Sequence, residues 1–289
     1  TVEYTGSEQS ITGFKHDAKD GSVTVTLKKD KEAVAKGTDA NTNPYYMGLT
    51  AEDFTVTSPN YTNIKVNVTD GWLKIDPTDD VLVVNVKGET LTTNYTGKPQ
   101  YVEGFDVLDA PDGVSVALAE EKTARAEGTD ADTYFMGLTS ECFVATSPNY
   151  TNIKVNVTDG WLKIEPKDTL IVEVTGTNKT VIYNGNEQSV TGFTTNAPED
   201  VTVELKKDSK AEAKGINADT YYMKLKPEDF TATSKNYKNI TISIKEDGFL
   251  EIKPITTETV VNINGNTDTK KYTGKEQTVE GFTSNAKDI

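Results

Sequence analysis

The stretch from Thr57 to Pro77, TSPNYTNIKVNVTDGWLKIDP, returns almost unchanged from Thr146 to Pro166 as TSPNYTNIKVNVTDGWLKIEP. The two stretches differ at one position, where Asp76 is replaced by Glu165. A looser third copy runs from 233 to 254. Self-similarity at a fixed period is the sequence signature of a repeat protein, so the fold of one repeat determines the fold of the chain.

A second motif, Tyr-x-Gly-x-x-Gln-x-x-x-Gly-Phe, occurs four times, at intervals of 91, 88 and 89 residues; it starts at Tyr4, Tyr95, Tyr183 and Tyr272. Together the motifs divide the chain into repeat 1 (1–77), repeat 2 (78–166), repeat 3 (167–254) and the start of a fourth repeat (255–289). Repeat 1 has no opening strand before its tyrosine, and the fourth repeat stops after its first hairpin. We therefore expect the natural protein to be longer at both ends.

Within a repeat, short runs rich in Val, Thr, Tyr and Ile alternate with turn residues every 8–12 positions, which is typical of β-sandwiches. We predict an all-β tandem array of small antiparallel, Ig-like sandwich units that form a rod. Residues 139–141 predict one helical turn capped by Thr139. The alternative is a β-grasp-like unit with a longer helix at this place. The Asp159-Gly160 pair predicts a tight hairpin, and 124–127 is the expected partner strand of 114–118. The segment 77–80 is the predicted linker between repeats 1 and 2.

Composition excludes several classes of function. The 289 residues carry a net charge of −15, which disfavours binding to nucleic acid or to anionic lipid. No apolar run is long enough to insert into a membrane. The single histidine, His16, is not repeated, so we predict no catalytic site and no enzymatic activity. The single cysteine, Cys142, takes the place of Asp53 and Asp229, and we interpret it as a surface position that has drifted.

The ordered motifs resemble a known group of repeats. The segment 183–193, YNGNEQSVTGF, is similar to the tyrosine-glycine repeats of the mucin-binding-like MBG and YDG families of large bacterial surface proteins. The segments 46–54, YMGLTAEDF, and 70–75, DGWLKI, extend the resemblance through the whole repeat. The resemblance implies a Gram-positive or gut-bacterial protein that is extracellular and attached to the cell wall, with its anchor outside these residues. It implies no particular ligand.

Aromatic residues are the candidate binding residues. Each repeat has an adjacent aromatic pair, and in a strand one member of each pair must face outward. We interpret the tryptophans after the Asp-Gly turns as core residues, with a sugar-stacking platform as the alternative. The candidate ligand-binding residues are Tyr45, Tyr46, Trp72, Tyr134, Phe135, Trp161, Tyr221 and Tyr222.

We predict no cofactor and no metal site, with calcium at the linkers as an alternative. Acidic runs at 17–20, 76–80 and 109–112 lie at turns or linkers, but none has the residue order of a calcium-binding loop. Solvated turns are the simpler interpretation of these runs.

These observations predict the stalk of a bacterial cell-surface adhesin. A multivalent module that binds host glycan, mucin or a surface protein is the first alternative. The second is a self-assembling surface fibre. Repeat 1 lacks an opening strand, whereas 260–263 is a spare one, so copies of the chain could associate through an edge strand.

Overall fold

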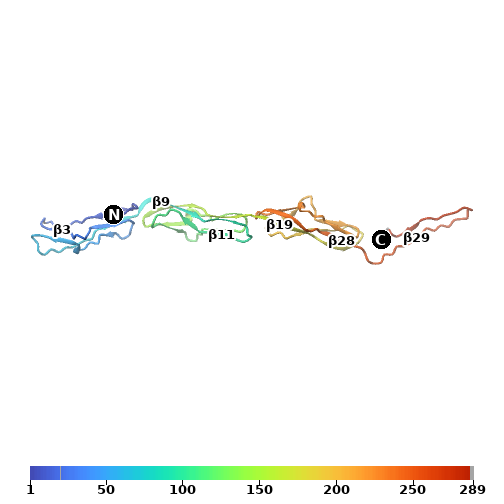
Figure 1. Cartoon of the computed structure of the whole chain (residues 1–289), viewed down its shortest axis with the longest axis horizontal. Helices are drawn as coiled ribbons and strands as arrows, with labels where there is room; N and C mark the ends of the chain where they lie inside the picture. The colour runs from blue at the N-terminus through green and yellow to red at the C-terminus, as the bar shows by residue number, and fades with distance from the viewer. Residues whose placement is uncertain (20, 287–289) are drawn as a thin grey trace. The chain divides into compact units, whose positions relative to one another are not determined.

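The computed structural model describes residues 1–19 and 21–286 (Figure 1). The chain divides into two compact units, residues 1–167 and 168–289, and the described part of each is treated by itself. Asp20, the last residue of the acidic run at 17–20, lies outside the described residues. The predicted all-β fold of small repeated units is confirmed, because the regular elements of the described residues are β-strands and three single turns of 3-10 helix.

Repeat 2 contains a complete set of elements. Its strands are β9 (Thr78–Gly88), β10 (Thr90–Asn94), β11 (Gln100–Glu103), β12 (Phe105–Val107), β13 (Ser115–Leu118), β14 (Arg125–Gly128), β15 (Asp132–Phe135), β16 (Phe143–Thr146), β17 (Tyr150–Thr158) and β18 (Trp161–Glu165). They form two three-stranded sheets, β12-β9-β17 and β10-β18-β15, and two pairs, β11-β14 and β13-β16. The predicted pairing of 114–118 with 124–127 is therefore wrong, since these segments pair with β16 and β11 respectively.

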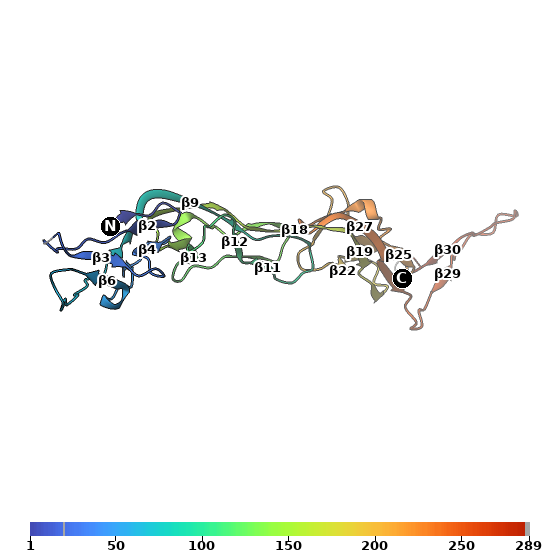
Figure 2. The same ribbon diagram turned by 60° about the vertical axis from the view of Figure 1, so that its left-hand side comes forward.

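The two longest runs of chain in repeat 2 lie side by side. β9 continues into β10, β17 continues into β18, and both the β9–β17 and the β10–β18 pairings are parallel. Antiparallel partners flank them, β12 beside β9 and β15 beside β18. Figure 2 shows β9 beginning near β2 and β4 of repeat 1 and continuing toward β12. The predicted linker segment 78–80 is thus the start of β9 instead of a loop.

The predicted hairpin at Asp159-Gly160 is wrong, because β17 and β18 pair with other strands. Asp159 instead accepts hydrogen bonds from the backbone N–H groups of Gly137 (3.0 Å) and Leu138 (2.9 Å). A Cβ atom on Gly160 would lie 2.5 Å from the carbonyl oxygen of Glu89, closer than such atoms approach. The pair therefore marks a close crossing of two chain segments, where glycine is required because it has no side chain.

Two small hydrophobic clusters form the core of repeat 2. One includes residues of β18, and the other includes residues of β9 and β17. The first packs Ala126, Leu162 and Ile164. The second packs five buried residues and several partly buried ones around β9 and β17; the buried ones are Val86, Ala124, Leu138, Cys142 and Phe143. Half-buried Met136 contacts both clusters. A lean hydrophobic content is sufficient for such narrow cores.

Repeat 3 repeats this plan in the second unit. Its strands are β19 (Lys167–Gly176), β20 (Lys179–Ile182), β21 (Gln188–Thr191), β22 (Phe193–Thr195), β23 (Thr202–Leu205), β24 (Glu212–Gly215), β25 (Thr220–Tyr222), β26 (Phe230–Thr233), β27 (Tyr237–Glu246) and β28 (Phe249–Lys253). The sheets are β22-β19-β27 and β20-β28-β25, with the pairs β21-β24 and β23-β26. The correspondence of every pairing with repeat 2 shows that one sequence pattern specifies one fold.

Repeat 1 has the same pairs but fewer strands. They are β1 (Val2–Glu3), β2 (Gln9–Thr12), β3 (Thr24–Leu27), β4 (Val34–Gly37), β5 (Tyr45–Tyr46), β6 (Phe54–Thr57), β7 (Trp72–Leu73) and β8 (Ile75–Asp76). The described residues provide no counterpart of β9, and no strand is assigned between 58 and 71. In the second unit, the described residues beyond repeat 3, up to 286, form one antiparallel pair, β29 (Ile263–Gly265) with β30 (Phe282–Ser284).

The predicted helical turn is confirmed as a 3-10 turn, η2 (Ser140–Cys142), with Thr139 as its N-cap. Its counterparts are η1 (Ala51–Asp53) and η3 (Pro227–Asp229). Three residues are far fewer than the helix that a β-grasp unit needs, so the alternative fold is excluded for the described residues.

Candidate functional site

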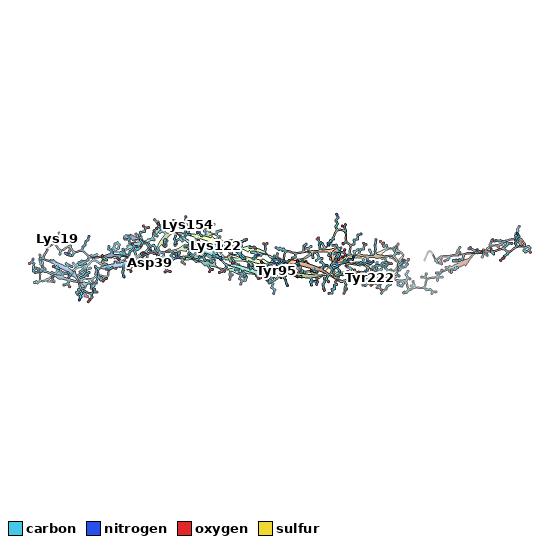
Figure 3. All side chains as sticks on the ribbon, turned by 45° about the horizontal axis from the view of Figure 1, so that its top comes forward. Lys19, Asp39, Tyr95, Lys122, Lys154 and Tyr222 are labelled. Atoms are coloured by element: carbon cyan, nitrogen blue, oxygen red, sulfur yellow. The ribbon has the colours of Figure 1, made fainter. Side chains whose placement is uncertain are left out.

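In each pair of adjacent aromatic residues, one side chain faces solvent and the other faces the core, as alternation along a strand requires. The second member of each pair is exposed: Tyr46 by 61%, Phe135 by 65% and Tyr222, labelled in Figure 3, by 56%. Each stands opposite an aromatic residue on the neighbouring strand; the pairs are Tyr46 with Trp72, Phe135 with Trp161, and Tyr222 with Phe249. Each repeat therefore presents two aromatic side chains on neighbouring strands, side by side. We call this cross-strand set the aromatic pair, to distinguish it from the two adjacent aromatic residues along one strand.

The first member of each adjacent pair is half-buried and has a structural role. Tyr45, Tyr134 and Tyr221 each donate a hydrogen bond from the hydroxyl to a main-chain carbonyl, at 2.8–3.2 Å. Each ring also covers a glycine so closely that a Cβ atom there would clash, at Gly37, Gly128 and Gly215. A ring that already fills this position and uses its hydroxyl is poorly placed to contact a ligand.

The tryptophans are not core residues, so the favoured interpretation of them is wrong. Trp72 is 46% exposed, and Trp161 is half-buried. Their neighbours Leu73 and Leu162 occupy the core instead. Because alternate residues of a strand face opposite sides, a buried leucine places the preceding tryptophan outward.

A second site lies at the junction between repeats 1 and 2, within the first unit. The side chain of Asn149 is 1% exposed and hydrogen-bonds to the loop of repeat 1 at Asp39 and Ala40. Its Oδ1 accepts from the backbone N–H of Ala40 at 2.7 Å, and its Nδ2 donates to Oδ1 of Asp39 at 3.0 Å. Figure 3 labels Asp39 where this loop lies. An amide that is buried and fully bonded in this way fixes the orientation of the groups around it.

Further contacts of β9 and β17 with repeat 1 surround this asparagine. Thr78 is buried, and its hydroxyl donates to Oε1 of Glu3 at 2.7 Å. Its backbone N–H donates to the carbonyl oxygen of Asn149 at 2.9 Å. The ring of Tyr4 packs edge-on against Tyr150 with centroids 5.4 Å apart, and burial raises the pKa of the Tyr4 hydroxyl. The junction is thus a packed interface with a polar centre, not a free linker.

Asn60 has the same local sequence as Asn149 but is exposed, since it has no preceding repeat among the described residues. The burial of Asn149 is therefore a property of the junction and not of the local sequence. The residue types alone gave no indication of this site. The available signal was the Asn-Tyr pair, which persists at 236–237 in the looser third copy.

The glutamine of the tyrosine motif has one structural role in all four copies. Its Nε2 donates to the main-chain carbonyl six residues earlier, at 2.9–3.2 Å; the residues are Gln9, Gln100, Gln188 and Gln277. The motif glycines that follow the tyrosines adopt positive φ between 69° and 78°. The motif therefore encodes a turn, which fits a structural interpretation of its tyrosine.

Cys142 is buried, so its interpretation as a surface position is wrong. Its Sγ accepts a weak hydrogen bond from the N–H of Thr139 at 3.5 Å, and this contact lowers the pKa of the thiol. In repeat 1 a carboxylate oxygen of Asp53 accepts from both the N–H and the hydroxyl of Thr50, at 2.7 and 2.9 Å. The thiol thus replaces a capping carboxylate at the 3-10 turn.

Among residues 1–19 and 21–286, no three His, Cys, Asp or Glu side chains gather as a metal-binding group. Calcium at the repeat boundaries stays a prediction. Across the same residues, no helix has the length and apolar character needed to cross a membrane.

Comparisons with known proteins leave the chain without an assigned family. No protein-family model matches it, and no curated protein matches it. Among solved structures, the I-band fragment I67-I69 from titin aligns over 89% of this chain and 95% of its own, at 8% identity and a TM-score of 0.18. The I9-I11 tandem from titin aligns over 88% and 96%, at 8% identity and a TM-score of 0.15. Scores this low carry no argument about function.

Proposed function

We propose that this chain is a non-enzymatic spacer in the stalk of a bacterial cell-surface adhesin. The observation that carries the proposal is the buried bonding of Asn149 to the preceding repeat, which makes the junction of repeats 1 and 2 a fixed interface. A spacer needs such junctions, because free linkers would let consecutive repeats fold back on one another. The acidic surface, with a net charge of −15, supports solubility where many copies are crowded together.

The bacterial and cell-wall parts of this proposal rest on the resemblance of the motifs to MBG and YDG repeats. Extracellular localisation is part of the same proposal, and a single buried thiol is compatible with it. The single histidine, which is not repeated, is compatible with a non-enzymatic role.

The spacer proposal predicts that Asn149→Ala loosens the junction. The substitution leaves the buried N–H of Ala40 without its partner, which costs about 1–3 kcal/mol. Spin labels at Lys36→Cys and Lys163→Cys, in a Cys142→Ser background, report the distance between repeats 1 and 2. We expect a narrow distance distribution in the parent and a broad one in the Asn149→Ala variant.

Asn60→Ala is the matched control, because it removes the same side chain from the same local sequence where it is exposed. It should leave the distribution narrow. A parent distribution as broad as that of the Asn149→Ala variant would show that the junction is flexible and would contradict the spacer proposal.

The aromatic pairs support a second candidate function, multivalent binding of glycan or mucin. An exposed ring can stack on the apolar face of a sugar, and three weak sites on one chain gain affinity through avidity. Tyr46, Phe135 and Tyr222 are each more than half exposed, so each repeat offers a similar platform. This function is compatible with the spacer, since it uses the outer surface of the repeats and not the junction.

If the aromatic pairs bind sugar, immobilised mucin should retain the parent chain. Phe135→Ala should weaken retention only partly, whereas the triple alanine variant at 46, 135 and 222 should abolish it, because avidity multiplies the loss. Tyr61→Ala is the control, since Tyr61 is 51% exposed but belongs to no aromatic pair. Absence of retention for the parent, or equal loss in the control, would eliminate this candidate.

A further inference from the structure

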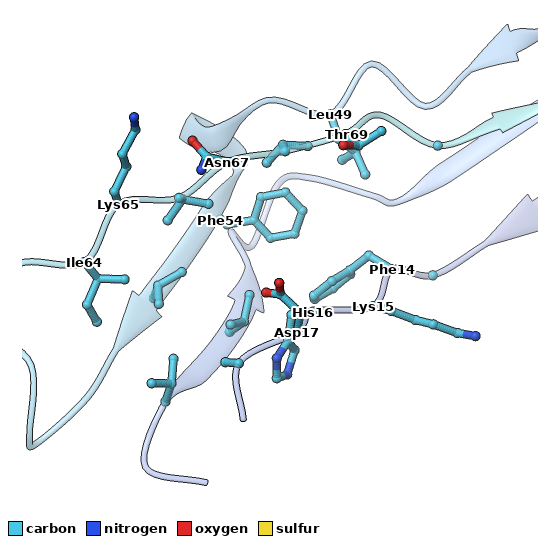
Figure 4. A pocket seen from close by; sticks show the side chains of 18 of the residues that line it. Phe14, Lys15, His16, Asp17, Leu49, Phe54, Ile64, Lys65, Asn67 and Thr69 are labelled. Carbon is cyan, nitrogen blue, oxygen red and sulfur yellow. The ribbon is translucent and has the colours of Figure 1, made fainter. Parts of the chain in front are cut away.

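A surface turn of repeat 3 carries a chemically labile amide. The groove of repeat 1, in contrast, is lined mainly by apolar side chains such as Phe14 and Phe54 (Figure 4). The sequence contains two Asn-Gly pairs, at 184–185 in repeat 3 and at 264–265 beyond it. In such a pair the glycine nitrogen can attack the asparagine side chain, because glycine has no Cβ atom to hinder the approach. The backbone around each pair decides how readily this attack occurs.

The two asparagines differ in their backbone and not in their exposure, since both side chains are exposed. Asn264 lies in β29 opposite Thr283 of β30, and main-chain hydrogen bonds at Asn262 and Asn266 flank it. Attack on Cγ by the nitrogen of the next residue requires the backbone to leave the extended conformation of a strand, so the pairing of β29 resists it. Asn184 lies in the turn between β20 and β21, where the required rotation breaks no strand pairing.

A hydrogen bond in this turn prepares the side chain of Asn184 for attack. Its Oδ1 accepts from the backbone N–H of Asn186 at 2.9 Å. The bond folds the side chain back along the peptide that supplies the nucleophile, and it stabilises the negative charge that develops on Oδ1 as the nitrogen attacks. Gly185 adopts a φ of 78°, which glycine tolerates without strain.

We propose that Asn184 is a site of spontaneous deamidation through a cyclic succinimide formed with the nitrogen of Gly185. The bond between that nitrogen and Cγ of Asn184 forms, and the bond between Cγ and Nδ2 breaks. Nδ2 leaves as ammonia, with the proton lost by the Gly185 nitrogen. Solvent water then opens the ring, at Cγ to give aspartate or at the main-chain carbonyl carbon to give isoaspartate. Neither step transfers electrons to or from another reactant.

The site is specific to repeat 3 among the four copies of the tyrosine motif. The residues that correspond to Asn184 are Thr5, Thr96 and Thr273, whose side chains have no amide. The inference does not depend on the spacer function, since it rests on the chemistry of one turn.

The two products affect the turn differently. Aspartate keeps an oxygen acceptor for the N–H of Asn186 and adds one negative charge to a chain of net charge −15. Isoaspartate lengthens the main chain inside the loop that Gln188 closes through its 3.1 Å hydrogen bond to the carbonyl oxygen of Ile182. In repeat 1 the same motif supplies Tyr4, which packs against Tyr150 at the junction. Isoaspartate formation therefore alters a motif that repeat 1 uses to contact its neighbour.

Ageing of the full chain in mildly alkaline buffer, followed by mass spectrometry of its proteolytic peptides, tests the proposal. Asn184 should convert about tenfold or more faster than Asn264, because reaction at Asn264 waits for local opening of β29. Electron-based fragmentation should identify isoaspartate among the products at 184. No conversion of Asn184, or equal conversion of the two asparagines, would overturn the proposal.

Unfolding the chain separates the effect of the fold from that of the local sequence. In guanidinium, where both Asn-Gly pairs are unfolded, the two rates should converge. A difference that persists in guanidinium would assign it to the neighbouring side chains and would contradict the role of the turn.

Two variants test the atoms involved. Gly185→Ala should slow the conversion of Asn184, because the added Cβ hinders attack, and no atom lies within 4 Å of its position to cause a clash. Asn184→Thr, which introduces the residue of the other three copies, should abolish the mass change in this peptide while Asn264 reacts as in the parent. Unchanged conversion in Gly185→Ala, or a mass change that persists in Asn184→Thr, would exclude the proposed reaction.

Discussion

The last residue of the 3-10 turn differs between the repeats, and it determines how strongly the turn is capped. In repeat 1, Lys31 lies 2.7 Å from Asp53, and this contact, with the hydrogen bonds from Thr50, lowers the pKa of Asp53 to about 2. In repeat 3, the carboxylate of Asp229 accepts hydrogen bonds from the backbone N–H of Lys226 and from the hydroxyl of Ser209. Repeat 2 keeps a lysine, Lys122, but has Cys142 in place of the carboxylate. Its turn is therefore the least strongly capped of the three.

We predict that Cys142→Asp stabilises repeat 2 by about 1 kcal/mol at neutral pH, the usual contribution of a capping side chain. Urea unfolding in a Trp72→Phe background isolates the fluorescence of Trp161, which lies in repeat 2. The gain should be complete above the unfolded pKa of about 3.9 and should disappear as pH falls toward 2, because a lowered folded pKa stabilises only the ionised state. Cys142→Ala lacks both acceptor and charge and should be no more stable than the parent. Destabilisation by Cys142→Asp would contradict the capping role.

At the residue scale, alternation along a strand predicted that one member of each adjacent aromatic pair faces outward, but not which member. The structure shows that it is the second, Tyr46, Phe135 or Tyr222. The same alternation places Trp72 outward beside buried Leu73, against its interpretation as a core residue. The burial of Asn149 does not follow from alternation, because the identical local sequence around Asn60 is exposed. Only the presence of the preceding repeat distinguishes the two asparagines.

At the scale of the element, the same local sequence forms a strand in repeat 2 and no assigned strand in repeat 1. Residues 57–75 and 146–164 are identical, yet β17 extends over Tyr150–Thr158 while its counterpart in repeat 1 contains no assigned strand. The difference lies in the partner, because β9 supplies the hydrogen bonds to β17 and the described residues supply none to 62–69. Strand formation here depends on pairing and not on intrinsic propensity.

Hydrogen exchange should therefore separate the two copies. We expect amides of 64–69 to exchange about a hundredfold or more faster than those of 153–158, because exchange follows local opening. Peptides that extend to Asp76 or Glu165 distinguish the copies by mass. Equal protection of the two segments would contradict the strand assignment in repeat 1.

The turn signals were the least reliable part of the sequence-based fold. The Asp159-Gly160 pair has the composition of a hairpin turn, but its aspartate caps the backbone at 137–138 and its glycine permits a close crossing. Backbone capping favours aspartate and a close crossing requires glycine, and these are also the residues of a hairpin turn. Composition alone cannot distinguish the crossing from a hairpin, because the deciding contacts come from segments more than twenty residues away.

For the whole molecule, the repeat period was the most informative signal. It predicted small all-β units, which the structure confirms, whereas the parallel pairing of β9 with β17 was not predicted. That pairing brings together strands about 70 residues apart in sequence, and the alternation of side chains in each strand does not specify its partner.

The junction described above has a genetic consequence. Both halves of it belong to the repeat: the loop Gly-Thr-Asp-Ala at 37–40 recurs at 128–131, and the Asn-Tyr pair at 60–61 recurs at 149–150. Unequal recombination between repeats 1 and 2 would add or remove a whole repeat and would keep both halves of this interface. The number of repeats can then change without compensating mutations at the junction.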